Sequence, residues 1–284
     1  MIEISEHPPP FLEVLVREDD LLPPIVALCG GYELKQWRAG QLASHLFEWL
    51  PEFALSWSER QRFSDATSVR LMRRAAQLVY DTDNYDRRGE FGELLLHAVV
   101  RQVFGSEPAI SKLFYKDSSN NTVKGFDAVH VVLNGDDMEL WLGEVKFYDN
   151  ASTAISHVVS ELHAHTELDY LRGEFALILN HLDPQWPQAS ALEALLDPNT
   201  SLDRVFSALC VPVLITYDSS VVAAHEAWTD DYRAAFREEV LELRERFASK
   251  GLPELKIHLL LVPLGSKKDL LDALHDQLDA WQNI

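Results

Sequence analysis

Two strand-like runs joined by a tight-turn signal constrain the fold of this chain most strongly. Residues 126–133 and 139–148 are rich in apolar and β-branched side chains, and Asn134-Gly135 lies between them. Short runs of this kind, bounded by turn residues, are typical of β-strands. Asn-Gly between them is a strong signal for a β-hairpin. The middle of the chain is therefore predicted to form an antiparallel hairpin.

This hairpin is expected to carry three charged side chains on one face. Glu144 and Lys146 are two residues apart in a strand, so they point the same way. A loop of two residues places Asp127 opposite Leu142, and a loop of four places it opposite Glu144. Both registers put Asp127 on the face of Glu144 and Lys146, whereas a three-residue loop moves it to the other face.

Two carboxylates and one amine on one face indicate a site for phosphodiester hydrolysis. Adjacent carboxylates repel each other, which raises the pKa of one of them, and a divalent cation removes that penalty. Mg²⁺ needs only one or two carboxylates, with water or phosphate oxygens as its other ligands. Such a cation activates water and stabilises charge on a phosphate. We expect Asp127 and Glu144 to hold Mg²⁺ (or Mn²⁺) and Lys146 to orient the water or the phosphate.

A third acid is expected from the preceding helix, predicted over residues 89–104. Glu90 and Glu93 are three residues apart and share a helix face. Glu93 is the preferred additional metal ligand because it lies deeper in the helix, beside Leu94. Glu90 is typical of a first turn, where the helix dipole favours acids. Both stay candidate catalytic residues.

The opposing interpretation is a solvated hairpin face. Gly-Phe-Asp or Glu-Val-Lys alone is a weak signal, because alternating charges decorate many exposed strands. Their combination across one hairpin, after a helix that carries glutamates, favours the nuclease site.

The remaining pattern predicts an α/β fold with a mixed central sheet flanked by helices. Apolar spacing indicates helices within residues 40–79, interrupted at Pro51 with Ser58 as a cap, and at 153–168, 226–250 and 268–281. Strands are expected at 11–16, 110–115, 211–217 and 255–262, and residues 175–182 fit either a helix or a strand. We expect a mostly helical N-terminal extension, residues 1–85, packed on a nuclease domain, residues 86–284.

The charge balance argues against a tight, autonomous DNA binder. The net charge is −20, whereas proteins that bind nucleic acids usually present a basic face to the phosphates. A partner that delivers the DNA, or a local basic path, resolves this conflict. The candidate path consists of basic residues around the hairpin: Arg87, Arg88, Arg101, Lys112, Lys116 and Lys124.

Other features exclude several classes of protein. Two cysteines, Cys29 and Cys210, cannot complete a four-cysteine zinc site. The acidic N-terminus does not fit a signal peptide, and no apolar run is long enough to span a bilayer. A cytoplasmic protein without a membrane partner is expected.

Two helical segments carry charged or titratable side chains without a clear role. His157, His163 and His165 lack the spacing of a metal site, so a helix surface is expected, with phosphate contact by one of them as the alternative. Residues 238–246 mix both charge signs, which fits a solvated face or a helix that docks a partner.

The residues of the hairpin and its preceding helix resemble the PD-(D/E)XK nuclease superfamily. Its core is a helix, three strands, a helix and a fourth strand, which is a restriction-endonuclease-like fold. The resemblance assigns the metal-binding Asp to Asp127, the Glu-x-Lys pair to Glu144 and Lys146, and the helix Glu to Glu93 or Glu90.

Arg-Gly-Glu-Phe-Gly-Glu at residues 88–93, with Gly-Phe-Asp and Gly-Glu-Val-Lys, is similar to the HamA family, the nucleases of the Hachiman anti-phage system. This resemblance implies DNA degradation in defence against phage and a helicase partner, HamB. The chain has no Gly-x-x-x-x-Gly-Lys-Ser/Thr loop, so ATP-driven unwinding would come from the partner. An RNA-cleaving enzyme and a non-catalytic scaffold remain the alternative functions.

Overall fold

A seven-stranded mixed sheet forms the centre of the molecule in the computed structural model, which describes residues 7–79, 89–111, 125–135 and 137–283. The strand order is β1-β2-β9-β8-β7-β6-β5. Pairs β2–β9, β9–β8 and β8–β7 are parallel, and the pairs at both edges are antiparallel. The strands are β1 (Glu13–Glu18), β2 (Ile25–Cys29), β5 (Glu107–Pro108), β6 (Ala128–Asn134), β7 (Asp137–Phe147), β8 (Leu209–Asp218) and β9 (Lys256–Leu264). A separate small hairpin is formed by β3 (Tyr32–Glu33) and β4 (Gln36–Trp37).

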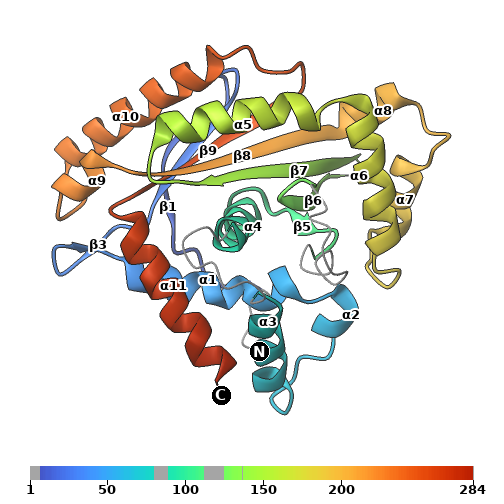
Figure 1. Cartoon of the computed structure of the whole chain (residues 1–284), viewed down its shortest axis with the longest axis horizontal. Coiled ribbons are helices and arrows are strands. Elements are labelled where there is room, and N and C mark those ends of the chain that lie inside the picture. Colours follow the sequence, from blue (N-terminus) through green and yellow to red (C-terminus); the bar gives the residue numbers. More distant parts are fainter. Residues whose placement is uncertain (1–6, 80–88, 112–124, 136, 284) are drawn as a thin grey trace.

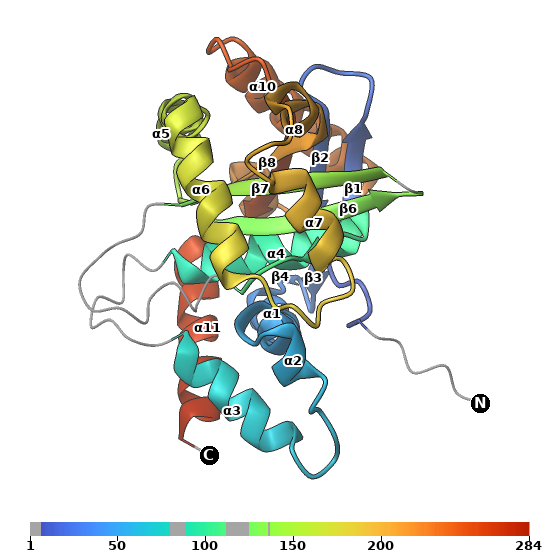
Figure 2. The same ribbon diagram turned by 90° about the vertical axis from the view of Figure 1, so that its right-hand side faces the viewer.

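Helices cover both faces of the sheet (Figure 1). One apolar core lies under six helices: α5 (Ala151–His165), α6 (Leu168–His181), α7 (Ala189–Leu196), α8 (Leu202–Ala208), α9 (Ser220–Ala224) and α10 (Asp230–Ala248). The other core lies under α1 (Ala39–Ala54), α3 (Ser68–Leu78), α4 (Glu90–Phe104) and α11 (Lys267–Gln282). The short α2 (Trp57–Arg60) follows α1. Figure 2 shows the same layers from the side, with α5 and α10 on one side of the sheet and α1, α3 and α11 on the other.

The expected α/β fold with a mixed sheet and flanking helices is confirmed. The N-terminal third, expected to be mostly helical, also supplies β1 and β2 to the central sheet. Residues 25–29 were not expected to form a strand, although all five are buried. The proposed boundary near residue 85 stays a prediction, because residues 80–88 lie outside the described part of the chain.

Several element boundaries differ from the sequence expectation. Ser56, not Ser58, caps α2 through a capping box with Glu59. Of the strand expected at residues 110–115, only residues 110 and 111 are described, and neither is in a strand: β5 ends at Pro108 and Ile110 lies in a bend. The helix expected over residues 153–168 is α5, which ends at His165, and Leu168 already begins α6. Residues 175–181, which fitted either a helix or a strand, are helical because they lie in α6.

The hairpin has the register that was expected for a four-residue loop, which places Asp127 opposite Glu144. Leu133 pairs with Met138, and the ladder runs from Asn134–Asp137 to Ala128–Gly143. Gly135 has φ +66° in the turn, a conformation that glycine adopts without a steric penalty. Continuing this register by one residue sets Asp127 opposite Glu144.

No helix among the described residues has the length and apolar character needed to cross a membrane.

The close approach of α4 to β7 generates a stability prediction. A Cβ on Gly92 would lie 2.8 Å from the Cβ of Phe147 and 3.2 Å from Cγ2 of Val145. Overpacking of this kind costs on the order of 1–3 kcal/mol. We expect Gly92→Ala to lower the melting temperature measured by calorimetry.

Gly173→Ala in α6 is the matched control. A Cβ on Gly173 would have nothing within 4 Å, and alanine in a helix is favoured over glycine by about 1 kcal/mol. This variant is expected to melt at the same or a higher temperature. A Gly92→Ala protein as stable as the control variant would contradict the close packing of α4 on β7.

Candidate active site

Asp127 is fixed against β7 by two hydrogen bonds. Its backbone N–H donates to the carbonyl oxygen of Gly143 at 2.7 Å, and its Oδ2 accepts from the backbone N–H of Val145 at 2.9 Å. Asp127 directly precedes β6, so the end of the ladder holds its carboxylate beside the neighbouring strand.

Strand alternation places Glu144 and Lys146 on the face covered by α5. Leu140 and Leu142 of β7 belong to the core on that side, whereas Val145 belongs to the opposite core. Glu144 and Lys146 continue the Leu140–Leu142 series at intervals of two residues. The apolar face of β7 therefore changes into a charged face at its end, beside Asp127.

Glu144 is buried and contacts a histidine. Its side chain is 1% exposed, and its Oε1 is hydrogen-bonded to Nδ1 of His165. Burial, with the nearby charge of Asp127, raises the pKa of Glu144 to about 7, although the hydrogen bond to His165 and the charge of Lys146 oppose this shift. Glu144 is thus a carboxylate whose charge needs a counter-charge in the site.

Lys146 forms an ion pair with a residue of α5. Its Nζ donates to Oε2 of Glu161. Burial acts to lower the pKa of Lys146, but the hydrogen bond and charge of Glu161 prevail and raise it, with Asp127 and Glu144 adding to the effect. The ammonium group therefore stays charged at neutral pH.

A cavity of about 590 Å³ lies beside these side chains. Asp127 and Lys146 line it together with residues from β7 and the segment after it, from α5 and α11, and from the N-cap of α4: Gly89, Val145, Phe147, Tyr148, Asp149, Thr153, Lys267 and Leu271. The charged end of the hairpin therefore opens to a space that can admit a substrate.

The two helix acids differ in burial. Glu93 is buried and Glu90 is half-buried. A Cβ on Gly89 would lie 3.8 Å from Oε1 of Glu93, and Gly89 lines the cavity. Oε1 of Glu93 therefore lies in the α4 layer close to Gly89, which is itself one of the residues that line the cavity.

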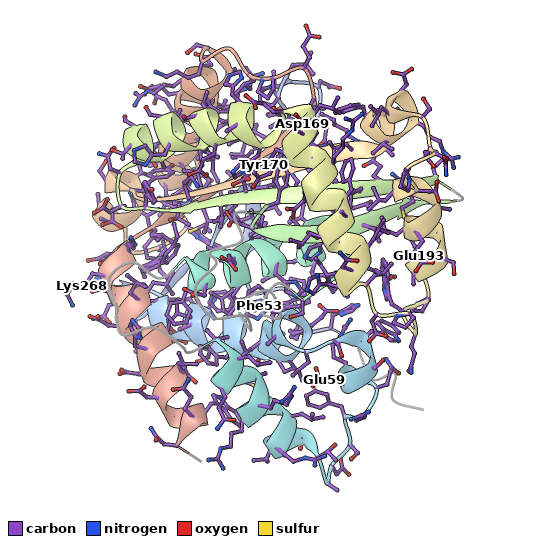
Figure 3. All side chains as sticks on the ribbon, turned by 45° about the vertical axis from the view of Figure 1, so that its right-hand side comes forward. Phe53, Glu59, Asp169, Tyr170, Glu193 and Lys268 are labelled. Atoms are coloured by element: carbon purple, nitrogen blue, oxygen red, sulfur yellow. The ribbon has the colours of Figure 1, made fainter. Side chains whose placement is uncertain are left out.

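Aromatic rings hold His165 in place. The His165 ring stacks on Tyr170 with centroids 4.3 Å apart and planes 10° apart. Phe126 approaches the same ring edge-on at 5.5 Å. Tyr170 lies at the start of α6 beside the sheet (Figure 3). The orientation of the imidazole is thus set by packing as well as by Glu144.

The structure adds residues that the sequence expectation missed. His165 was expected on a helix surface, but it contacts Glu144, and Glu161 was not considered at all. Their spacing of four residues on one helix, directly after the Glu-x-Lys strand, is the signal that pairs them. Glu174 is also buried, and a Cβ on Gly125 would lie 2.8 Å from its Oε2.

The expected basic path is wrong at Arg101. Its guanidinium is buried and bonds the carboxylate of Glu52, at 2.8 Å from Nε to Oε2 and 2.9 Å from Nη2 to Oε1. Arg101 therefore cannot face DNA. The other members of the expected path, Arg87, Arg88, Lys112, Lys116 and Lys124, lie outside the described residues.

The donor set fits a hard divalent cation with few protein ligands. Within the described ranges, no three His, Cys, Asp or Glu side chains are grouped closely enough to hold a metal by themselves. Asp127 and Glu144 supply two carboxylates, which is the number that Mg²⁺ commonly takes from a protein. Burial, with the nearby charge of Asp127, raises the pKa of Glu144, and a bound cation relieves both effects.

Comparison with known proteins gives an independent assignment. The family model HamA matches residues 9–278. Anti-bacteriophage protein A of Escherichia coli (strain K12) is 23% identical over 257 residues, covering 87% of this chain and 46% of that protein. The chain thus spans about half the length of this relative. Since the family model matches almost the whole chain, the resemblance inferred from the sequence is confirmed, and the chain belongs to the HamA family.

Proposed function

We propose that this HamA-family protein is a nuclease that hydrolyses DNA with Mg²⁺ (or Mn²⁺) and acts with a helicase partner in anti-phage defence. One observation carries the nuclease assignment: Asp127, Glu144 and Lys146 converge at the end of one strand pair, beside a cavity of about 590 Å³. A scaffold gains nothing from gathering two carboxylates and an amine at a buried position.

The proposed roles follow from the chemistry of each group. Asp127 and Glu144 hold the cation, and Glu93 is the candidate for an additional ligand from α4. The bound cation would supply an activated water and stabilise the charge of the phosphate. Lys146, whose raised pKa keeps it charged, orients the water or the scissile phosphate. Glu90, which is half-buried in the first turn of α4, is ranked last among the candidate catalytic residues.

The choice of DNA and of a helicase partner rests on the family and on charge. The named relative is an anti-bacteriophage protein, and DNA degradation is the activity that the resemblance to the HamA family implies. A chain with a net charge of −20 repels nucleic acid at long range. A partner that holds the DNA and presents it to the cavity overcomes this repulsion.

Removal of the Glu144 charge is expected to abolish cleavage. Glu144→Gln keeps the shape of the side chain but cannot neutralise a cation, so Mg²⁺-dependent cleavage of plasmid DNA should fall by at least about a hundredfold. Lys146→Ala should have a similar effect. The assay contains the protein alone and with its candidate helicase.

Glu139→Gln is the matched control, because Glu139 lies on β7 at the end away from the cavity and pairs with Lys256 at 2.5 Å. This variant should cleave as the wild-type protein does. Cleavage that survives in Glu144→Gln would mean that the site lies elsewhere. Cleavage of RNA but not of DNA would move the assignment to a ribonuclease.

The raised pKa of Glu144 generates a pH prediction. A proton and the cation compete for this carboxylate, so Mn²⁺ affinity, measured by titration calorimetry, should rise roughly tenfold per pH unit up to about pH 7 and then level off. Glu144→Gln should bind Mn²⁺ weakly at every pH. Equal wild-type affinity at about pH 6 and about pH 8 would contradict the proposed ligand.

The same shift affects stability in a defined direction. The folded protein keeps the Glu144 proton up to about pH 7, whereas the unfolded chain loses it near the ordinary value of 4.5. Loss of this proton therefore lowers the free energy of unfolding as pH rises between these two values. Glu144→Gln should flatten this part of the stability profile in thermal unfolding.

A further inference from the structure

Both reactive groups of the proposed site are already paired with side chains of one helix. Lys146 is ion-paired with Glu161, and Glu144 is hydrogen-bonded to His165. Glu161 and His165 are four residues apart on α5, so they lie on one helix face one turn apart. Both contacts to the proposed site therefore come from the same face of α5.

Glu161 occupies the group that is proposed to bind the substrate phosphate, the ammonium group of Lys146. A carboxylate on an ammonium group presents negatively charged oxygens at the place where a phosphate oxygen would bind Lys146. The Glu161 side chain is 42% exposed, whereas that of Lys146 is 9% exposed. The acid is thus the solvent-facing partner, and it can swing away while the lysine stays in the site.

His165 occupies an oxygen of the carboxylate that is proposed to bind the cation. His165 Nδ1 is hydrogen-bonded to Glu144 Oε1, so this carboxylate oxygen is already engaged by a side chain of α5. Packing against Tyr170 and Phe126 keeps the imidazole at this position. The buried carboxylate therefore has a hydrogen-bonded partner before any cation arrives.

We propose that Glu161 and His165 are competing side-chain partners that hold the site in a resting arrangement, and that substrate phosphate and cation must displace them. This inference rests on the proposed function, since it assumes that Lys146 binds phosphate and Glu144 binds a cation. The negative charge of Glu161 also repels approaching phosphates. Activity thus depends on the outcome of this competition.

The phosphate half of the competition is tested with Glu161→Gln. The change keeps the shape of the side chain and removes the charge that competes for Lys146. Affinity for a short fluorescein-labelled DNA duplex, measured by anisotropy at low salt without divalent cations, should increase roughly two- to fivefold. The gain should disappear when Lys146→Met is added to Glu161→Gln, because the competed group is then absent.

Glu167→Gln is the matched control for the change in net charge. Glu167 is exposed, and its side chain does not cap α6. This variant removes the same charge near the same helix without touching Lys146. A Glu161→Gln protein that binds DNA no better than Glu167→Gln, including no detectable binding by either, would overturn the phosphate half of the proposal.

The cation half is tested with His165→Gln and Mn²⁺ alone. An amide is a weaker competitor for Glu144 than an imidazole, so Mn²⁺ affinity by calorimetry should increase, on the order of tenfold. Unchanged or weaker binding would overturn this half and make His165 a residue that positions Glu144 for the metal.

Failure of the proposed function gives a different result. A protein that never cleaves nucleic acid, even with the helicase and Mg²⁺, refutes the nuclease assignment whatever the two affinities show. Normal cleavage by the wild-type protein without gains in either affinity refutes only the role of α5.

Discussion

The hydrogen bonds between Asp127 and β7 are the constraint on which the site depends. One joins its N–H to Gly143, and the other joins its carboxylate to the N–H of Val145. A slip of one residue in the β6–β7 ladder would turn Asp127 away from Glu144. The backbone therefore enforces the approach of two carboxylates that repel each other, and the sheet around them provides the rigidity.

The hairpin and its charges were predictable because their signals are local. Alternation assigns Glu144 and Lys146 to one face, and Asn134-Gly135 limits the possible registers. Residues 25–29 were harder to recognise, because this fully buried strand pairs with β9 more than two hundred residues later in the chain. Apolar runs without alternation give no periodic signal, and the partner strand is invisible in the local sequence.

The role of His165 was harder to predict for a related reason. Its helix shows a weak amphipathic pattern, and only the packing of α5 over the end of β7 brings it to Glu144. The burial of Arg101 has the same origin, because its partner Glu52 lies on α1. A charged residue that is close to a motif in sequence can thus belong to a different part of the structure, because its tertiary contacts decide where its side chain lies.

The buried network around Glu52 explains how the N-terminal helices are attached. Burial acts to raise the pKa of Glu52, but hydrogen bonds and charges from His97 and Arg101 hold it below its ordinary range. His97 in turn contacts His130 of β6 at 3.2 Å. Removing one member would leave a buried charge without its partner, which is strongly destabilising. The helical layer is therefore bound to the strand that follows Asp127 through directly hydrogen-bonded side chains of α1, α4 and β6.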